Sequence, residues 1–172
     1  IELTAFVFNH KLNIDPKPVY NIYILLNFLF YFIFYKNHFN KTRNKKIANL
    51  FIVLHLGLFF GTLFFLKTDF FSKLYSNIIV FSSVLLIIIL LLYLVEIIND
   101  KRIIFNLKKS FIYWISIGAI LFHIGIIPIM ITSEYLQFHG LYQYIIIPLN
   151  YIMYGCFIIG IIVSDNKTKN YN

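Results

Sequence analysis

The chain has 172 residues, of which 60% are hydrophobic and only 13% are charged. Its mean hydropathy of +0.79 excludes a water-soluble domain, because a soluble fold of this length cannot hide so much apolar surface. The net charge is +8, and the Lys and Arg residues lie in short segments between apolar runs. That distribution is typical of membrane proteins and argues against a nucleic-acid partner.

Five apolar stretches are long enough to cross a hydrocarbon core of about 30 Å as helices. In chain order they are expected at about residues 19–35, 47–66, 74–98, 111–132 and 142–163. Residues 1–8 are too short to span and lack the features of a signal peptide, so we expect the end of a truncated first helix there. The prediction is an all-α, polytopic transmembrane helical bundle with five full spans plus the end of an earlier one, in a single domain covering 1–172.

The loop charges predict how the spans are oriented. Residues 36–46, residues 99–110 and the C-terminal tail together hold eleven Lys or Arg residues, whereas residues 9–18, 67–73 and 133–141 hold four. The richer set is expected in the cytoplasm by the positive-inside rule. We therefore predict a multi-pass protein of the bacterial inner (plasma) membrane with a cytoplasmic C-terminus.

Four polar side chains fall in the middle of predicted spans: Asn27, His55, His123 and Asn150. Each must find a partner, because an unpaired polar group in hydrocarbon costs several kcal/mol. We expect an intramembrane polar cluster that makes hydrogen bonds between helices, and the alternative is a small cavity that binds a ligand. The two histidines also permit axial ligation of a haem iron, but their depths differ by about 6 Å, and we expect neither a cofactor nor a metal.

Glycine spacing predicts where helices pack closely. Gly57 and Gly61 lie four residues apart in the second full span, and Gly118 and Gly125 share a face of the fourth. Glu96 is the only acidic residue inside a span, and it lies near the end of the third. A structural or capping role is expected for it, because ion-coupled transporters place charged groups near the midplane.

The phrases YWISIGAILFHIGIIPIM and LNYIMYGCFIIGII resemble late segments of a class of six-helix membrane proteins from Bacteroidota. In that class a phrase like FWISxGxLxYxxG opens a late helix, and Trp114, Gly118 and Gly125 match it. PVYNIYILLNFLFYF, residues 18–32, is similar to an early helix of the class, which often has an acidic residue where Asn27 stands. The resemblance implies a role like that of the membrane input region of some sensor histidine kinases.

The sequence thus predicts a non-enzymatic integral inner-membrane protein, either a sensor-like module or a subunit or scaffold of a larger membrane assembly. Its expected partners are the lipid bilayer and another membrane protein. The first alternative is a small transporter or channel, and the second is a membrane enzyme that acts on lipid or quinone. The sequence contains no HExxH motif, phosphate-binding glycine loop or nucleophile motif, which disfavours the enzyme.

Overall fold

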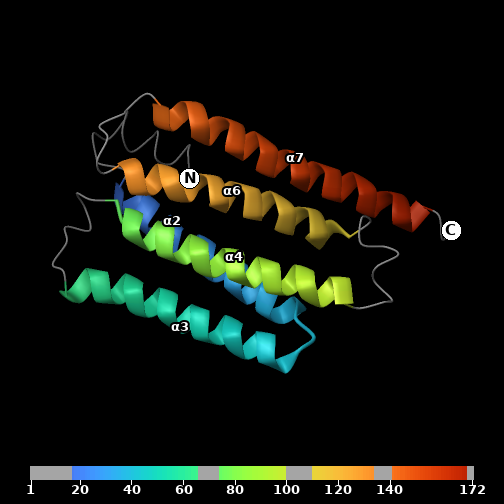
Figure 1. The fold of residues 1–172 in the computed structure, drawn as a ribbon, viewed down its shortest axis with the longest axis horizontal. Coiled ribbons are helices and arrows are strands. Elements are labelled where there is room, and N and C mark those ends of the chain that lie inside the picture. Colours follow the sequence, from blue (N-terminus) through green and yellow to red (C-terminus); the bar gives the residue numbers. More distant parts are fainter. Residues whose placement is uncertain (1–16, 66–73, 100–109, 134–140, 170–172) are drawn as a thin grey trace.

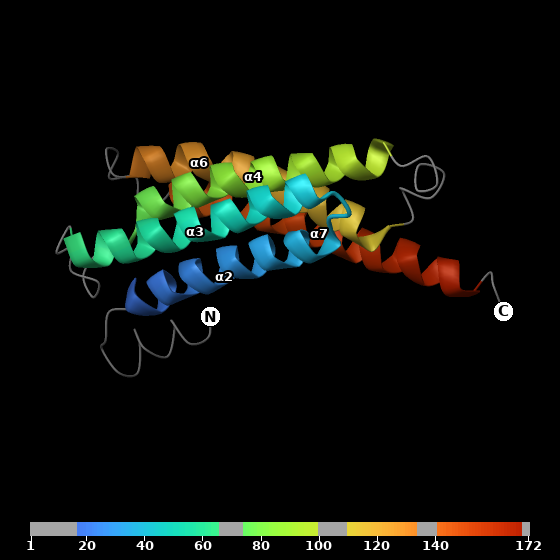
Figure 2. The same cartoon turned by 90° about the horizontal axis from the view of Figure 1, so that it is seen from below.

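The computed structural model describes residues 17–65, 74–99, 110–133 and 141–169. Within them the chain forms five helices, which run up and down alongside one another (Figures 1 and 2): α2 (Lys17–His38), α3 (Thr42–Phe65), α4 (Ser76–Asn99), α6 (Phe111–Ser133) and α7 (Leu141–Lys169). All five are long and apolar enough to cross a membrane. The predicted all-α helical bundle is confirmed, and the chain is a multi-pass membrane protein. The helix end expected at residues 1–8 lies outside the described residues.

Several helices extend beyond the apolar stretches. α2 ends at His38 and α3 begins at Thr42, so most of the basic segment 36–46, expected to be a loop, is helical. α7 likewise continues past the predicted end at residue 163, to Lys169. Lys and Arg are good helix formers, and hydropathy marks only the part of a helix that lies in hydrocarbon.

A buried carboxylate caps the start of α3. Glu96, at the end of α4, is 7% exposed and accepts hydrogen bonds from the backbone N–H groups of Asn40 at 2.6 Å and Lys41 at 2.8 Å. The side-chain amide of Asn44 donates to the other carboxylate oxygen at 2.5 Å. The negative charge therefore meets unpaired N–H groups at the positive end of the helix dipole. Glu96 joins α4 to the α2–α3 turn, as its expected capping role requires.

α4 is the central helix of the described bundle. It packs against α2, α3 and α6, and Figure 1 shows it between α3 and α6. Half of its apolar stretch is buried inside the protein, against 11% for α7. A helix that is apolar all round can be buried on several faces at once, which explains why the most hydrophobic helix occupies this position.

α6 and α7 form a closely packed pair at the edge of the bundle (Figure 1). A Cβ added at Gly118 would lie 2.8 Å from the Cβ of Cys156 and 3.1 Å from the carbonyl oxygen of Met153. One added at Gly125 would lie 2.6 Å from a methyl group of Leu149. The two helices can approach this closely only because α6 has no side chain at these two positions.

The other predicted glycine pair lies in a different environment. A Cβ added at Gly57 or Gly61 of α3 would have no atom of the described structure within 4 Å. Large apolar side chains on the outer faces of α3 and α7 are also exposed, including Val53 at 64%, Phe64 at 71% and Ile161 at 58%. Such surfaces are stable in contact with lipid tails.

Candidate functional site

Two consecutive serines on α4 each form a hydrogen bond with a histidine of a neighbouring helix. Ser82 lies 2.7 Å from Nδ1 of His55 on α3, and Ser83 lies 2.9 Å from Nδ1 of His123 on α6. All four residues are buried. Successive residues of a helix point about 100° apart. Two consecutive serines can therefore form hydrogen bonds with helices on two different sides of α4.

Both ring nitrogens of His55 have partners. Nε2 lies 3.3 Å from the carbonyl oxygen of Leu25 on α2, and because a carbonyl only accepts, Nε2–H must donate. In the neutral imidazole Nδ1 is then the acceptor, and the Ser82 hydroxyl donates to it. His55 therefore links α2, α3 and α4 and leaves no nitrogen for a ligand.

His123 has a different environment. Three aromatic rings surround it, with centroids 5.4 Å away for Phe28, 6.3 Å for Tyr31 and 5.3 Å for Phe122. Ser83 occupies its Nδ1, and no described residue provides a hydrogen-bond partner for Nε2. The ring lines a pocket, so Nε2 is the polar atom that it can offer to a ligand there.

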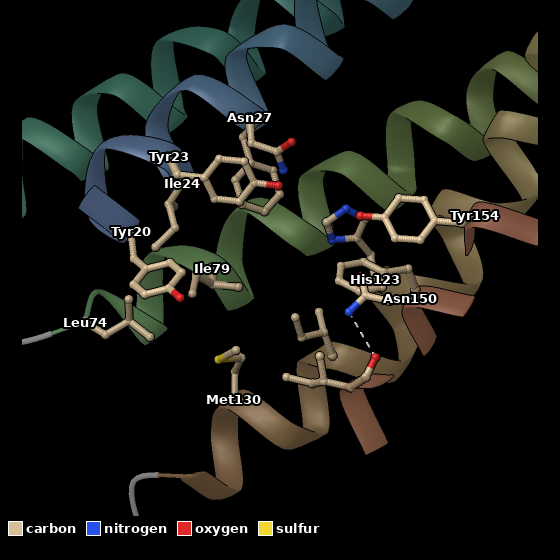
Figure 3. A pocket seen from close by; sticks show the side chains of 14 residues that line it. Tyr20, Tyr23, Ile24, Asn27, Leu74, Ile79, His123, Met130, Asn150 and Tyr154 are labelled. Carbon is tan, nitrogen blue, oxygen red and sulfur yellow. Dashed lines mark hydrogen bonds between the residues drawn. The ribbon is translucent and has the colours of Figure 1, made fainter. Parts of the chain in front are cut away.

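The pocket has a volume of about 530 Å³ and lies between α2 on one side and the α6–α7 pair on the other (Figure 3). Ligand sites in proteins typically measure about 300–1,000 Å³. It is lined by Tyr20, Tyr23, Ile24, Asn27, Phe28, Leu74, Ile79, Phe122, His123, Ile126, Met130, Ile146, Asn150 and Tyr154. These residues occupy the half of the bundle that contains the start of α2, which the loop charges predict to be the outer half.

Three more side chains of the lining have polar groups that no described residue satisfies. Asn150 on α7 donates one amide hydrogen to the carbonyl of Ile146 at 3.1 Å, which leaves its second N–H and its oxygen. Asn27 on α2 and the Tyr154 hydroxyl on α7 make no hydrogen bond with any described residue. Figure 3 shows His123, Asn150 and Tyr154 on one side and Asn27 on the other.

The structure therefore brings three of the four predicted polar residues to one pocket, namely Asn27, His123 and Asn150. His55 lies apart from them, bonded to Ser82 and Leu25. Tyr154 was not singled out from the sequence, because an aromatic residue in an apolar run gives no sign of which way it faces. Within the described residues, no group of three or more His, Cys, Asp or Glu side chains is arranged to hold a metal ion.

Comparisons of the chain with known protein families, with curated proteins and with solved structures found no match.

Proposed function

We propose that the protein is a non-enzymatic, sensor-like module of the bacterial inner membrane. A small molecule binds between α2 and the α6–α7 pair and changes the position of α7 relative to α2. The pocket of about 530 Å³ between them carries this proposal, because it is of ligand size and contains polar groups that no described residue satisfies. In a membrane such groups are costly unless a ligand or water pairs with them.

The packing supports movement of α7 rather than of α2 or α6. α2 is fixed to α3 and α4 by the His55 contacts and by Asn21, which accepts a hydrogen bond from the backbone N–H of Tyr75 at 3.1 Å. α6 is joined to α2 by the hydrogen bond between Tyr35 and Ser116 and to α4 by the one between Ser83 and His123. α7 packs on α6, and only 11% of its apolar stretch is buried. A molecule that touches Asn27 and Asn150 at once has contacts on both walls, so its binding favours one spacing over others.

The output of such a module passes to a membrane-protein partner through the displaced α7, with its C-terminus in the cytoplasm. The part of the pocket lining that the structure describes contains no Asp, Glu, Lys or Arg. It therefore offers no charged group for coupling transport to an ion gradient, and a sensor-like role is favoured over a small transporter.

The binding step is tested by filling the pocket. Ile126 lines it and is 8% exposed, whereas Ile124, two residues earlier on the same helix, is 54% exposed. Wild type, Ile126→Trp and the control Ile124→Trp are purified in mild detergent and extracted with organic solvent. Mass spectrometry should find a molecule that wild type and the control retain and Ile126→Trp loses. Identical extracts from all three would contradict the proposal.

The movement is tested by spin labels on two exposed positions, Val53 on α3 and Ile158 on α7, with Cys156 replaced by Ala. The distance between labels is measured by pulsed electron resonance in lipid nanodiscs. Ile126→Trp occupies the pocket permanently, whereas Ile124→Trp is measured after detergent exchange has removed its bound molecule and left the pocket empty. The distance should therefore differ between the two variants. Equal distances in the two variants would show a rigid bundle, which is a scaffold and not a sensor.

A further inference from the structure

The uncharged lining restricts which kinds of ligand the pocket can bind. None of the described residues that line the pocket carries a formal charge, and an isolated ion in a medium of low dielectric constant is very costly. A phosphate, a carboxylate or an ammonium group would enter without a counter-charge. The ligand that fits this lining is therefore uncharged.

The residue types of the lining favour a flat ring. Five aromatic side chains contribute to it, in addition to the imidazole of His123: Tyr20, Tyr23, Phe28, Phe122 and Tyr154. Aromatic faces and edges pack well against another planar ring. The branched side chains of Ile24, Ile79 and Ile126, together with Met130, complete an apolar border against which an aliphatic substituent can lie.

Hydrogen-bond donors come from both walls of the pocket. The Asn27 amide is on α2, whereas the second N–H of Asn150 is on α7. A hydrocarbon tail would leave these groups unsatisfied, which costs about 1–3 kcal/mol for each buried group. A rigid ring with acceptor oxygens on opposite edges can accept from both walls at once.

We infer that the pocket binds the headgroup of a quinone, an uncharged flat ring with two carbonyl oxygens. Asn27 donates to one carbonyl, and Asn150 and Tyr154 are placed for the other, with His123 beside the ring. This inference rests on the proposed function, in that it names the small molecule whose binding sets the position of α7 relative to α2.

The probe is 2,3-dimethyl-1,4-naphthoquinone, whose substituted ring carbons keep it from reacting with Cys156. The matched probe, 2,3-dimethylnaphthalene, has the same rings and methyl groups and no carbonyl. Equilibrium dialysis against nanodiscs, corrected for uptake by protein-free nanodiscs, gives both affinities. The quinone should bind about tenfold more tightly, as expected for two hydrogen bonds of ordinary strength. Equal affinities would overturn the inference.

Asn27→Leu tests the carbonyl contact, and Asn37→Leu is its control, since Asn37 is exposed near the far end of the same helix. Asn27→Leu should weaken quinone binding about fivefold and leave binding of the hydrocarbon unchanged, while Asn37→Leu alters neither. If Asn27→Leu does not fold, Tyr154→Phe replaces it. Tyr151→Phe, at a position that is 74% exposed and not part of the lining, is then the control.

These experiments distinguish a failure of the quinone inference from a failure of the sensor proposal. If Ile126→Trp loses a retained molecule but neither the carbonyls nor Asn27 affect affinity, the quinone inference is wrong and the sensor proposal stands. If the pocket-filling variant also retains everything that wild type retains, both are wrong.

Discussion

A single methyl group at Gly118 should weaken the α6–α7 pair. In Gly118→Ala the new Cβ would lie 2.8 Å from the Cβ of Cys156, 3.1 Å from the carbonyl oxygen of Met153 and 3.4 Å from its Cα. Two of these atoms belong to the backbone of α7, so no side-chain rotation can relieve the contact. The helices must separate, and the contacts on either side of Gly118 are lost with them.

The magnitude follows from a comparison with Gly155 on α7, where an added Cβ would meet no described atom within 4 Å. Both substitutions gain about 1 kcal/mol from the higher helix propensity of Ala. Only Gly118→Ala also carries the cost of overpacking, about 1–3 kcal/mol. The free energy of unfolding should therefore be about 1–3 kcal/mol lower for Gly118→Ala than for Gly155→Ala.

The assay is reversible unfolding in mixed micelles by titration with sodium dodecyl sulfate, followed by circular dichroism. Cys156→Gly removes the nearest clashing atom but leaves the Met153 carbonyl, so the double variant should recover only part of the loss. If Gly118→Ala and Gly155→Ala have equal stability, α6 and α7 are not in contact at Gly118, and the described packing is wrong.

Other predictions concern the cap, the buried histidine and the orientation. Glu96→Gln places an amide opposite donor groups and should cost about 2 kcal/mol of unfolding free energy, with faster hydrogen exchange at the Asn40 and Lys41 amides; unchanged exchange would refute the cap. In a double-mutant cycle, His55→Phe and Ser82→Ala should couple by about 0.6 kcal/mol, the usual strength of a hydrogen bond between membrane helices. A coupling energy of zero would show that the two side chains form no such bond. Lys45→Cys, with Cys156 replaced by Ala, should react with an impermeant maleimide in inside-out vesicles only; labelling of intact cells would reverse the predicted orientation.

Much of the fold could be predicted from composition and spacing. Long apolar runs leave a helix as the only way to satisfy the backbone in lipid, so the number and kind of elements follow from the sequence. The exact ends do not, because α3 begins among basic residues and is capped by Glu96, a residue more than fifty positions away in the chain. A cap between distant residues has no local sequence signature.

The candidate site was predictable only in part. Asn27, His123 and Asn150 stand out as polar residues in apolar runs, but periodicity does not show that they face one pocket, since every helix here is apolar on most faces. Serines inside helices usually bond back to the preceding turn, so Ser82 and Ser83 gave no sign that they bind histidines of two other helices. His55 and His123 differ at the other ring nitrogen, which donates to the Leu25 carbonyl in His55 and has no described partner in His123.

The central claim is that the pocket between α2 and the α6–α7 pair holds a small molecule. An experimental density map of the protein in nanodiscs of its native lipids tests it most directly. We predict non-protein density of ring size between Asn27, His123 and Asn150, with α2 and α7 held apart around it. A collapsed pocket, with Asn27 bonded directly to Asn150 or His123, would contradict the claim.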